Sequence, residues 1–337
     1  MSDILLEGKI IAIPKQEKRL VQEKEQLYQQ LKVEILKGEL SGQIITLENG
    51  HLPTVKQNQY RQGELVMVGA TDLANEQTYY LADYIRRDGL SVLAVIFLVM
   101  VLLVTRKQGF LAILGMILTF GIVFKFTIPF ILAGHNPFFI SLISVSIIIP
   151  TTFYLSHGFK RKTHAGVIAT LLSLFLTILF GFLAVEGLHL TGFASEDSTF
   201  LLAIMGEVIN IRGLLLAGLV IASLGVINDV TMSQASVVNE LKCVNPQMKL
   251  SQLYSQSMRV GRDHISSMVD TLILTYAGAS LPLLVLLSHS SVPWTQTINM
   301  EMIAEEIMRT LIGSIGLILA VPITTLIAAF LVKGEQN

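Results

Sequence analysis

The amino-acid sequence predicts an α-helical polytopic membrane protein of about seven transmembrane helices, with a small all-β soluble domain at the N-terminus. The 337 residues are 52% hydrophobic and 15% charged, with a mean hydropathy of +0.63, whereas soluble domains carry roughly a quarter charged residues. Of the 49 charged residues, 24 basic and 25 acidic, 24 lie in the first 88 positions. Long apolar runs occupy the chain beyond Asp88. These observations together predict a polar head and a membrane-embedded body.

The head, residues 1–88, has the pattern of short β-strands. Five runs are rich in β-branched and aromatic residues, and Gly, Asn, Pro or Asp separates several of them. A small barrel or sandwich of four or five strands therefore fits this domain. The charged stretch KQEKRLVQEKEQLYQQL fits a short helix or a solvated loop equally well. The five runs are LLEGKIIAI, QLKVEIL, GQIITL, GELVMVGA and QTYYLADY.

Seven largely uncharged runs follow the head. Each has a length suited to the hydrocarbon core of a bilayer, which needs about 20 residues with a range of roughly 17 to 25. Internal prolines such as Pro150 and Pro322 usually kink a spanning helix. We therefore expect residues 89–337 to form one transmembrane helical domain. Its spans are expected near residues 89–105, 109–134, 137–156, 165–185, 208–229, 265–288 and 310–332.

Basic residues between the runs predict the orientation. If the seven runs alternate, ten Lys and Arg residues flank one side and only Arg212 and Arg309 flank the other. Cytoplasmic loops are enriched in Lys and Arg, so we expect a cytoplasmic C-terminus and an extracytoplasmic head. The ten are Arg106, Lys107, Lys160, Arg161, Lys162, Lys242, Lys249, Arg259, Arg262 and Lys333. The opposite flanks hold Glu186, Glu196, Asp197, Glu207, Glu301, Glu305 and Glu306.

This orientation raises a question about the N-terminus. The first 25 residues contain no apolar run suited to a signal peptide or an anchor. The head then crosses the membrane as an N-terminal tail, or an anchor precedes this sequence, or the orientation is inverted. Arg86 and Arg87, directly before the first run, favour inversion.

Polar residues interrupt the fifth and sixth runs at helical spacing. Steps of four, three and four residues place the polar residues that begin at Asp229 on one helical face. A similar, shorter pattern opens the sixth run. Both stripes enter the membrane from the side expected to be cytoplasmic. The predicted site residues are Asp229, Ser233, Ser236 and Glu240 in the first stripe and Asp263, Ser267 and Asp270 in the second, with Arg262 beside the second and Thr271 and Lys125 as weaker candidates.

The chemistry of the stripes suggests transport. An intramembrane carboxylate costs about 2.5 to 3.5 kcal/mol on insertion scales, so it is expected to face water or a partner. Carboxylates and hydroxyls suit a hard divalent cation or a proton relay, and no resident cofactor is expected. The alternative is that Asp229 and Asp270 lie at the membrane interface, either solvated or paired with Arg259 and Arg262 in a structural clamp that fixes two helix ends. The single cysteine, Cys243, provides no disulfide, and the net charge of -1 gives no reason to expect nucleic acid.

Several segments of the chain have a familiar sequence. They are VINIRGLLLAGLVIASLGVINDVTMSQASVVNEL (208–241), GRDHISSMVDTLILTYAGASLPLLVLL (261–287), HGFKRKTHAGVIATLLS, LHLTGFASED and, in the head, YRQGELVMV and YYLADYIRRDGL. Through these segments the chain resembles the YibE/F family of bacterial multi-pass membrane proteins. The resemblance implies several spans in a bacterial cytoplasmic membrane and, as partners, a second copy or a related member, since two members are often encoded together. Longer members carry an anchor before the head, and the family more often has Asn where this chain has Asp270.

Three functions follow in order of preference. The first is a transporter or permease of a small solute or ion that uses intramembrane carboxylates. The second is a non-transporting partner protein whose β domain binds a ligand or an envelope component. The third is an enzyme in which Asp229 and Asp270 share a proton. Since HExxH, GxSxG and phosphate-loop motifs are absent from the sequence, we expect no enzymatic activity.

Overall fold

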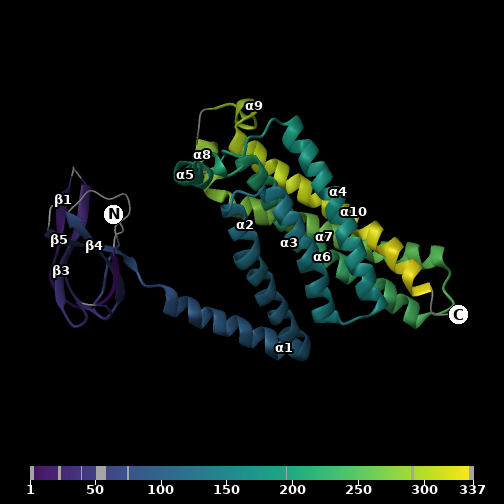
Figure 1. Cartoon of the computed structure of the whole chain (residues 1–337), viewed down its shortest axis with the longest axis horizontal. Coiled ribbons are helices and arrows are strands. Elements are labelled where there is room, and N and C mark those ends of the chain that lie inside the picture. The colour runs from purple at the N-terminus through teal and green to yellow at the C-terminus, as the bar shows by residue number, and fades with distance from the viewer. Residues whose placement is uncertain are drawn as a thin grey trace. The chain divides into compact units, whose positions relative to one another are not determined.

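The chain divides into two compact units, residues 1–100 and 101–337, which we describe separately. Figure 1 shows the fold in a computed structural model. The structure describes residues 4–21, 24–38, 40–50, 58–73, 76–194, 196–289 and 292–333.

The first unit contains one curved antiparallel sheet. Its strands lie in the order β3-β2-β1-β4-β5, and every neighbouring pair is antiparallel. The sequence prediction of a β-rich head with four or five strands is confirmed, and the described strands form a single sheet instead of a sandwich. The strands are β1 (Ile4–Val21), β2 (Lys24–Ile35), β3 (Ile44–Asn49), β4 (Leu65–Leu73) and β5 (Glu76–Tyr84).

The charged stretch between residues 15 and 31 forms neither a helix nor a loop, so both sequence interpretations of it are wrong. β1 and β2 run through it as a long hairpin that pairs up to Val21 and Lys24. Cross-strand contacts explain this, because Lys18 Nζ lies 3.4 Å from Glu25 Oε2 and the guanidinium of Arg19 lies 3.5 Å from the centroid of the Tyr28 ring. Such cross-strand pairs stabilise a hairpin that composition alone predicts to be solvated.

One fully buried amide organises the side of the sheet near β2. Gln29 donates from Nε2 to the Tyr60 carbonyl oxygen at 2.8 Å and accepts from the Tyr60 N–H at 2.9 Å. Its Oε1 also accepts from Asn49 Nδ2 at 3.2 Å. A buried polar group is stable when it is paired in this way. The surrounding core contains Ile10, Leu31, Val33, Ile35, Leu47, Val66 and Val68.

The first apolar helix is interrupted near its middle. α1 (Arg87–Ile122) contains non-helical backbone at Arg106, with φ 51° and ψ -124°. A Cβ built on Gly109 would lie 2.8 Å from the Val101 carbonyl oxygen, whereas residues eight apart in a straight helix are separated by about 12 Å along the axis. The chain therefore folds back on itself here, at the basic pair that separates the first two predicted spans.

Among the described residues, five helices are long and apolar enough to cross a membrane, or six if one bent pair counts as a span. This count treats residues 87–132 as one element of 46 residues. The break at Arg106 lies between the predicted spans 89–105 and 109–134, which explains the difference from seven. The remaining elements are a π-helix (Val123–Thr127), α2 (Ile128–Leu132), α3 (Pro137–His157), α4 (Arg161–Gly187), α5 (Glu196–Met205), a 3-10 turn (Gly206–Val208), α6 (Ile211–Val244), α7 (Leu250–Ala279), α8 (Leu281–His289), α9 (Trp294–Thr297) and α10 (Glu301–Lys333).

Two of the predicted spans end elsewhere in the structure. α6 continues for 15 residues past Asp229 instead of ending there. α7 begins at Leu250, and the bend of 67° between α7 and α8 falls inside the predicted sixth span. Polar residues on one face of a helix do not interrupt its backbone hydrogen bonds, so the helices extend beyond the apolar runs.

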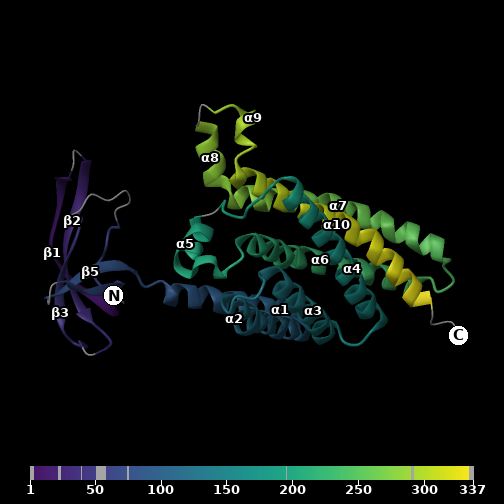
Figure 2. The same ribbon diagram turned by 45° about the horizontal axis from the view of Figure 1, so that its top comes forward.

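α10 is the centre of the second unit and packs against α4, α6 and α7 (Figure 2). The start of α4 lies beside the end of α10, where Arg161 Nη1 donates to the Leu331 carbonyl oxygen at 3.4 Å. At the opposite end, Val185 of α4 packs with Leu215 of α6 and Met308 of α10. We call the first the basic end and the second the acidic end. Ala165 of α4, Val238 of α6, Leu253 of α7 and Ala328 of α10 pack together at the basic end, so these four helices alternate in direction as the sequence predicts.

Candidate functional site

The first predicted stripe lies on an outward face of α6. Asp229, Ser233 and Glu240 are exposed and Ser236 is partly buried. The opposite face is packed, since Val230 and Val238 are completely buried. The helical spacing therefore places these residues on one face, as the sequence predicts.

The second stripe is also exposed, on α7. This holds for all five of its predicted residues: Arg262, Asp263, Ser267, Asp270 and Thr271. Lys125, the remaining weak candidate, is exposed in the π-helix.

A buried hydrogen bond between α6 and α7 fixes the relative positions of the two stripes along the helix axes. Gln234 Nε2 of α6 donates to the Ser257 carbonyl oxygen of α7 at 3.0 Å and to Thr325 Oγ1 of α10 at 2.7 Å. At a rise of 1.5 Å per residue, Asp229 and Asp263 lie about 7.5 Å and about 9 Å from that level toward the acidic end. Asp270 lies about 19.5 Å from it. The stripes thus bring Asp229 level with Asp263, not with Asp270.

No ion pair joins the stripes within the described part of the chain. The predicted structural clamp between these aspartates and Arg259 or Arg262 is not formed there. The described residues also contain no group of three or more His, Cys, Asp or Glu side chains that would hold a metal ion. The geometry shows two separate exposed carboxylate faces.

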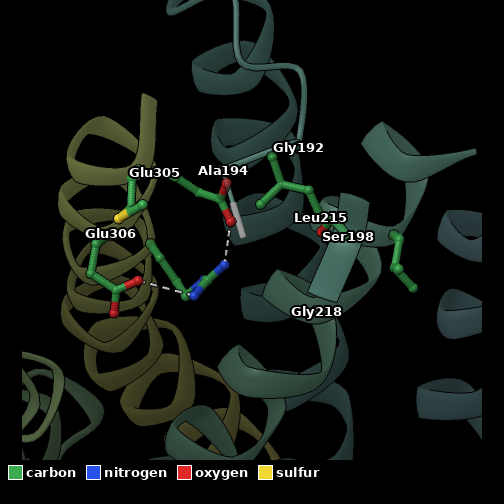
Figure 3. Close-up of a pocket in the computed structure, with 10 residues that line it drawn as sticks. Gly192, Ala194, Ser198, Leu215, Gly218, Glu305 and Glu306 are labelled. Atoms are coloured by element: carbon green, nitrogen blue, oxygen red, sulfur yellow. Dashed lines mark hydrogen bonds and ion pairs between the residues drawn. The ribbon is translucent and has the colours of Figure 1, made fainter. Parts of the chain in front are cut away.

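The structure reveals a different site at the acidic end. A cavity of about 270 Å³ lies among the loop that follows α4, α5, the first turns of α6 and the first turns of α10 (Figure 3). Its charged residues all come from α10. The lining residues are Gly192, Ala194, Ser198, Leu214, Leu215, Gly218, Met302, Glu305, Glu306 and Arg309.

The cavity contains one cation held between two carboxylates. The Arg309 guanidinium donates to Glu305 Oε1 at 2.5 Å and to Glu306 Oε2 at 3.1 Å, as the dashed lines in Figure 3 mark. The spacings of four and three residues place these side chains on adjacent turns. The Glu305 side chain is only 13% exposed, and its Oε2 atom is buried without a hydrogen-bond partner among the described residues. The site therefore presents one buried acceptor that the protein leaves unpaired.

A third acidic residue of α10 fastens the loop that walls the cavity. Glu301 accepts hydrogen bonds from Thr191 N at 2.5 Å, from Thr191 Oγ1 at 2.8 Å and from Gly192 N at 3.0 Å. Gly192 has φ +86°, and a Cβ built on it would lie 3.0 Å from the Ile211 carbonyl oxygen. The loop therefore requires glycine here for both its backbone conformation and its close approach to α6.

Removal of this carboxylate is expected to loosen the cavity wall. In Glu301→Ala the amides of Thr191 and Gly192 lose their acceptor, and hydrogen bonds to a charged group stabilise by about 1.5 to 3 kcal/mol. We expect amide hydrogen exchange in residues 188–194 to become about tenfold faster or more. Glu186→Ala is the control, because Glu186 pairs with Arg212 at 2.9 Å and not with the loop. Equal exchange in the two variants would show that Glu301 does not hold the loop.

Comparison with known proteins identifies the family. Residues 93–334 match the family described as YibE/F-like protein. This match covers more than two thirds of the chain. The chain belongs to the YibE/F-like family. No curated protein matches the sequence, and no solved structure matches it either.

The match confirms the resemblance to the YibE/F family that the sequence suggested. It covers all seven predicted spans apart from the first four residues, and it lies beyond the β domain. In this YibE/F-like body, both predicted stripes and the cavity lie inside the matched region.

Sequence reasoning named Glu305, Glu306 and Arg309 only as flanks in the orientation count. A local signal was present, because an arginine four and three residues after two glutamates predicts ion pairs on one helix face. No pattern in the sequence indicated the cavity itself. Its walls come from segments around residues 192, 215 and 305, and no spacing rule connects positions so far apart in the sequence.

Proposed function

We propose that this YibE/F-like protein is a transporter or permease that moves a small solute or ion across the membrane. The observation that carries the proposal is the cavity at the acidic end of the helical bundle. Carboxylates and guanidinium groups in apolar helices are rare and usually belong to substrate or ion pathways. The Glu305–Arg309–Glu306 group lies in such a helix and lines the cavity.

The position of this group along α10 suits the entrance of a transport path. Residues 310–332 of α10 carry no charge. Those 23 residues extend about 35 Å at 1.5 Å per residue, close to the ~30 Å of a hydrocarbon core. We place the cavity at the boundary of the membrane on the acidic side, which the basic flanks assign to the outside of the cell.

One face of α6 links the cavity to the first stripe. Gly218 lines the cavity, and Gly225, Asp229 and Ser233 follow at steps of seven, four and four residues, close to a single face. A Cβ built on Gly218 or Gly225 would meet no atom within 4 Å. This face therefore has open space beside its two glycines and a carboxylate at Asp229, which lies about 16.5 Å from Gly218 along the helix axis. We assign it as the translocation path.

Proton coupling suits this path better than a divalent cation. Hard divalent cations take six to eight oxygen ligands, whereas the described residues offer no group of three His, Cys, Asp or Glu side chains that could hold one. A single carboxylate suffices to carry a proton, and Asp229 is the carboxylate on the path.

The enzyme alternative gains no support from the geometry. An acid and base pair must lie within reach of one substrate atom. The axial offset of about 12 Å between Asp229 and Asp270 separates them along their helices. The partner-protein alternative, in which the β domain binds an envelope component, stays a prediction.

Vesicle reconstitution tests transport. Purified protein in liposomes is challenged with an isosmotic panel of small cationic, neutral and anionic solutes, and light scattering follows swelling. We expect at least one solute to enter faster than in empty liposomes. Asp229→Asn should reduce that rate at least tenfold, whereas Asp88→Asn, outside the bundle, should leave it unchanged. No entry of any solute with folded wild-type protein, or full entry with Asp229→Asn, contradicts the proposal.

A further inference from the structure

We infer that the cavity at the acidic end recognises an organic ammonium ion, whose N–H group donates to Oε2 of Glu305. This inference deepens the proposed function, on which it rests, because it names the chemical class of the solute. It is carried by the charge of the cavity, by the pairing of its polar atoms and by its size.

The charge of the cavity is negative. Its lining contains two acidic residues, Glu305 and Glu306, and one basic residue, Arg309, so the formal sum is -1. Arg309 donates to both carboxylates, so its charge is already neutralised. One negative charge therefore remains in the cavity. It would repel a bound anion, whereas a bound cation would neutralise it.

The pairing of polar atoms points to a hydrogen-bond donor. Glu305 Oε1 accepts from Arg309, and Oε2 is buried with no donor among the described residues. A buried acceptor without a partner costs about 1 to 3 kcal/mol, more when it is charged. Because the Oε2 atom is itself buried, the Glu305 side chain must turn toward the cavity to receive an ammonium N–H group. The ammonium ion then provides both the missing donor and the missing positive charge, and charge-assisted hydrogen bonds are about twice as strong as neutral ones.

The size and the lining select an organic cation over a metal ion. A water molecule occupies about 30 Å³ in the liquid, so about 270 Å³ far exceeds the space that a bare metal ion fills. Leu214, Leu215 and Met302 supply apolar walls. A short alkyl chain fits such walls, and one unpaired carboxylate oxygen falls well below the ligand number of a hard metal ion.

Binding to the purified full-length protein in detergent micelles tests the inference. The probe is n-butylammonium, titrated calorimetrically beside butan-1-ol, butyrate and Mg²⁺. We expect n-butylammonium to bind at least tenfold more tightly than the other three. Glu305→Gln should weaken it at least tenfold, whereas Glu186→Gln, which removes the same charge at the same end outside the cavity, should change it less than twofold.

A second pair of variants tests the location without removing a charge. Gly218→Leu places a side chain beside the cavity, and Gly121→Leu places the same side chain on the exposed surface of α1, outside the lining. Neither glycine has an atom within 4 Å of a built Cβ, so both variants should fold. We expect Gly218→Leu to weaken n-butylammonium binding at least tenfold and Gly121→Leu to leave it within twofold.

The outcomes separate this inference from the proposed function. Equal affinity for butan-1-ol and n-butylammonium, tighter binding of Mg²⁺, or unchanged binding in Glu305→Gln or Gly218→Leu would each overturn the inference. If ammonium binding behaves as expected but no solute enters vesicles, transport is wrong and the ammonium site stands. If neutral solutes enter vesicles and ammonium ions do not bind, transport stands and the ammonium site is wrong.

Discussion

Gly316→Ala is expected to destabilise the helical bundle by about 1 to 3 kcal/mol, the usual cost of overpacking a filled core. Gly316 of α10 lies directly against α4. A Cβ built on it would lie 2.9 Å from Cγ2 and 3.2 Å from Cβ of Thr177, and closer still to Thr177 Oγ1. Thr177 has no freedom to move away, because it is fully buried and its hydroxyl donates to the Ser173 carbonyl oxygen at 2.7 Å. The two helices would have to separate.

A neighbouring glycine is the matched control. Gly313 lies one turn earlier on α10 and is also buried, but a Cβ built on it meets no atom within 4 Å. Gly313→Ala is expected to be neutral or to stabilise by about 0.5 to 1 kcal/mol, because alanine favours the helix. Thermal unfolding in detergent measures both variants. A Gly316→Ala protein at least as stable as Gly313→Ala would show that α4 and α10 do not pack this closely.

Gln29→Leu is expected to destabilise the β domain by about 2 to 6 kcal/mol, since two buried backbone groups of Tyr60 lose their partner at about 1 to 3 kcal/mol each. Tyr60 is 3% exposed, so water cannot replace the lost amide. The Asn49 amide keeps its hydrogen bond to the Asn58 carbonyl oxygen at 2.7 Å, so its loss contributes less to the destabilisation. The loss of stability should be confined to the β domain.

Hydrogen exchange across the full-length protein measures this effect. We expect faster exchange in β2, in β3 and at residues 58–60, with the helices unchanged. Gln16→Ala is the control, because Gln16 is exposed and makes one bond of 3.2 Å to Gln29. If Gln29→Leu exchanges no faster than Gln16→Ala, the buried amide does not hold the sheet together.

The long apolar helices of this YibE/F-like chain could be predicted because they depend on local composition. Apolar runs of about 20 residues are recognisable without knowledge of their neighbours. The same is true of the face on which Asp229 and Ser233 lie, which follows from helical period alone. In the head, alternation of β-branched and polar residues predicted strands, but the charged hairpin arm was missed because cross-strand pairing stabilises it.

The candidate cavity could not be predicted in the same way. Glu305 and Arg309 form a recognisable local pair, but nothing in their spacing shows what lies opposite them. The structure places the loop around Gly192 and the face of α6 at Gly218 there. Those contacts join segments about 90 to 115 residues distant in sequence from Glu305, a separation at which local propensity carries no information.

The sequence by itself determined the apolar helical body, the β-rich head, the family and the helical faces of the polar stripes, because composition and periodicity are properties of short segments. Only the tertiary structure decided that the chain folds back at Arg106, that Asp229 lies level with Asp263, and that a negatively charged cavity forms around Glu305. The physical reason is that a void with an unpaired buried oxygen results from how side chains of separate helices fill space, and this depends on contacts that no single segment specifies.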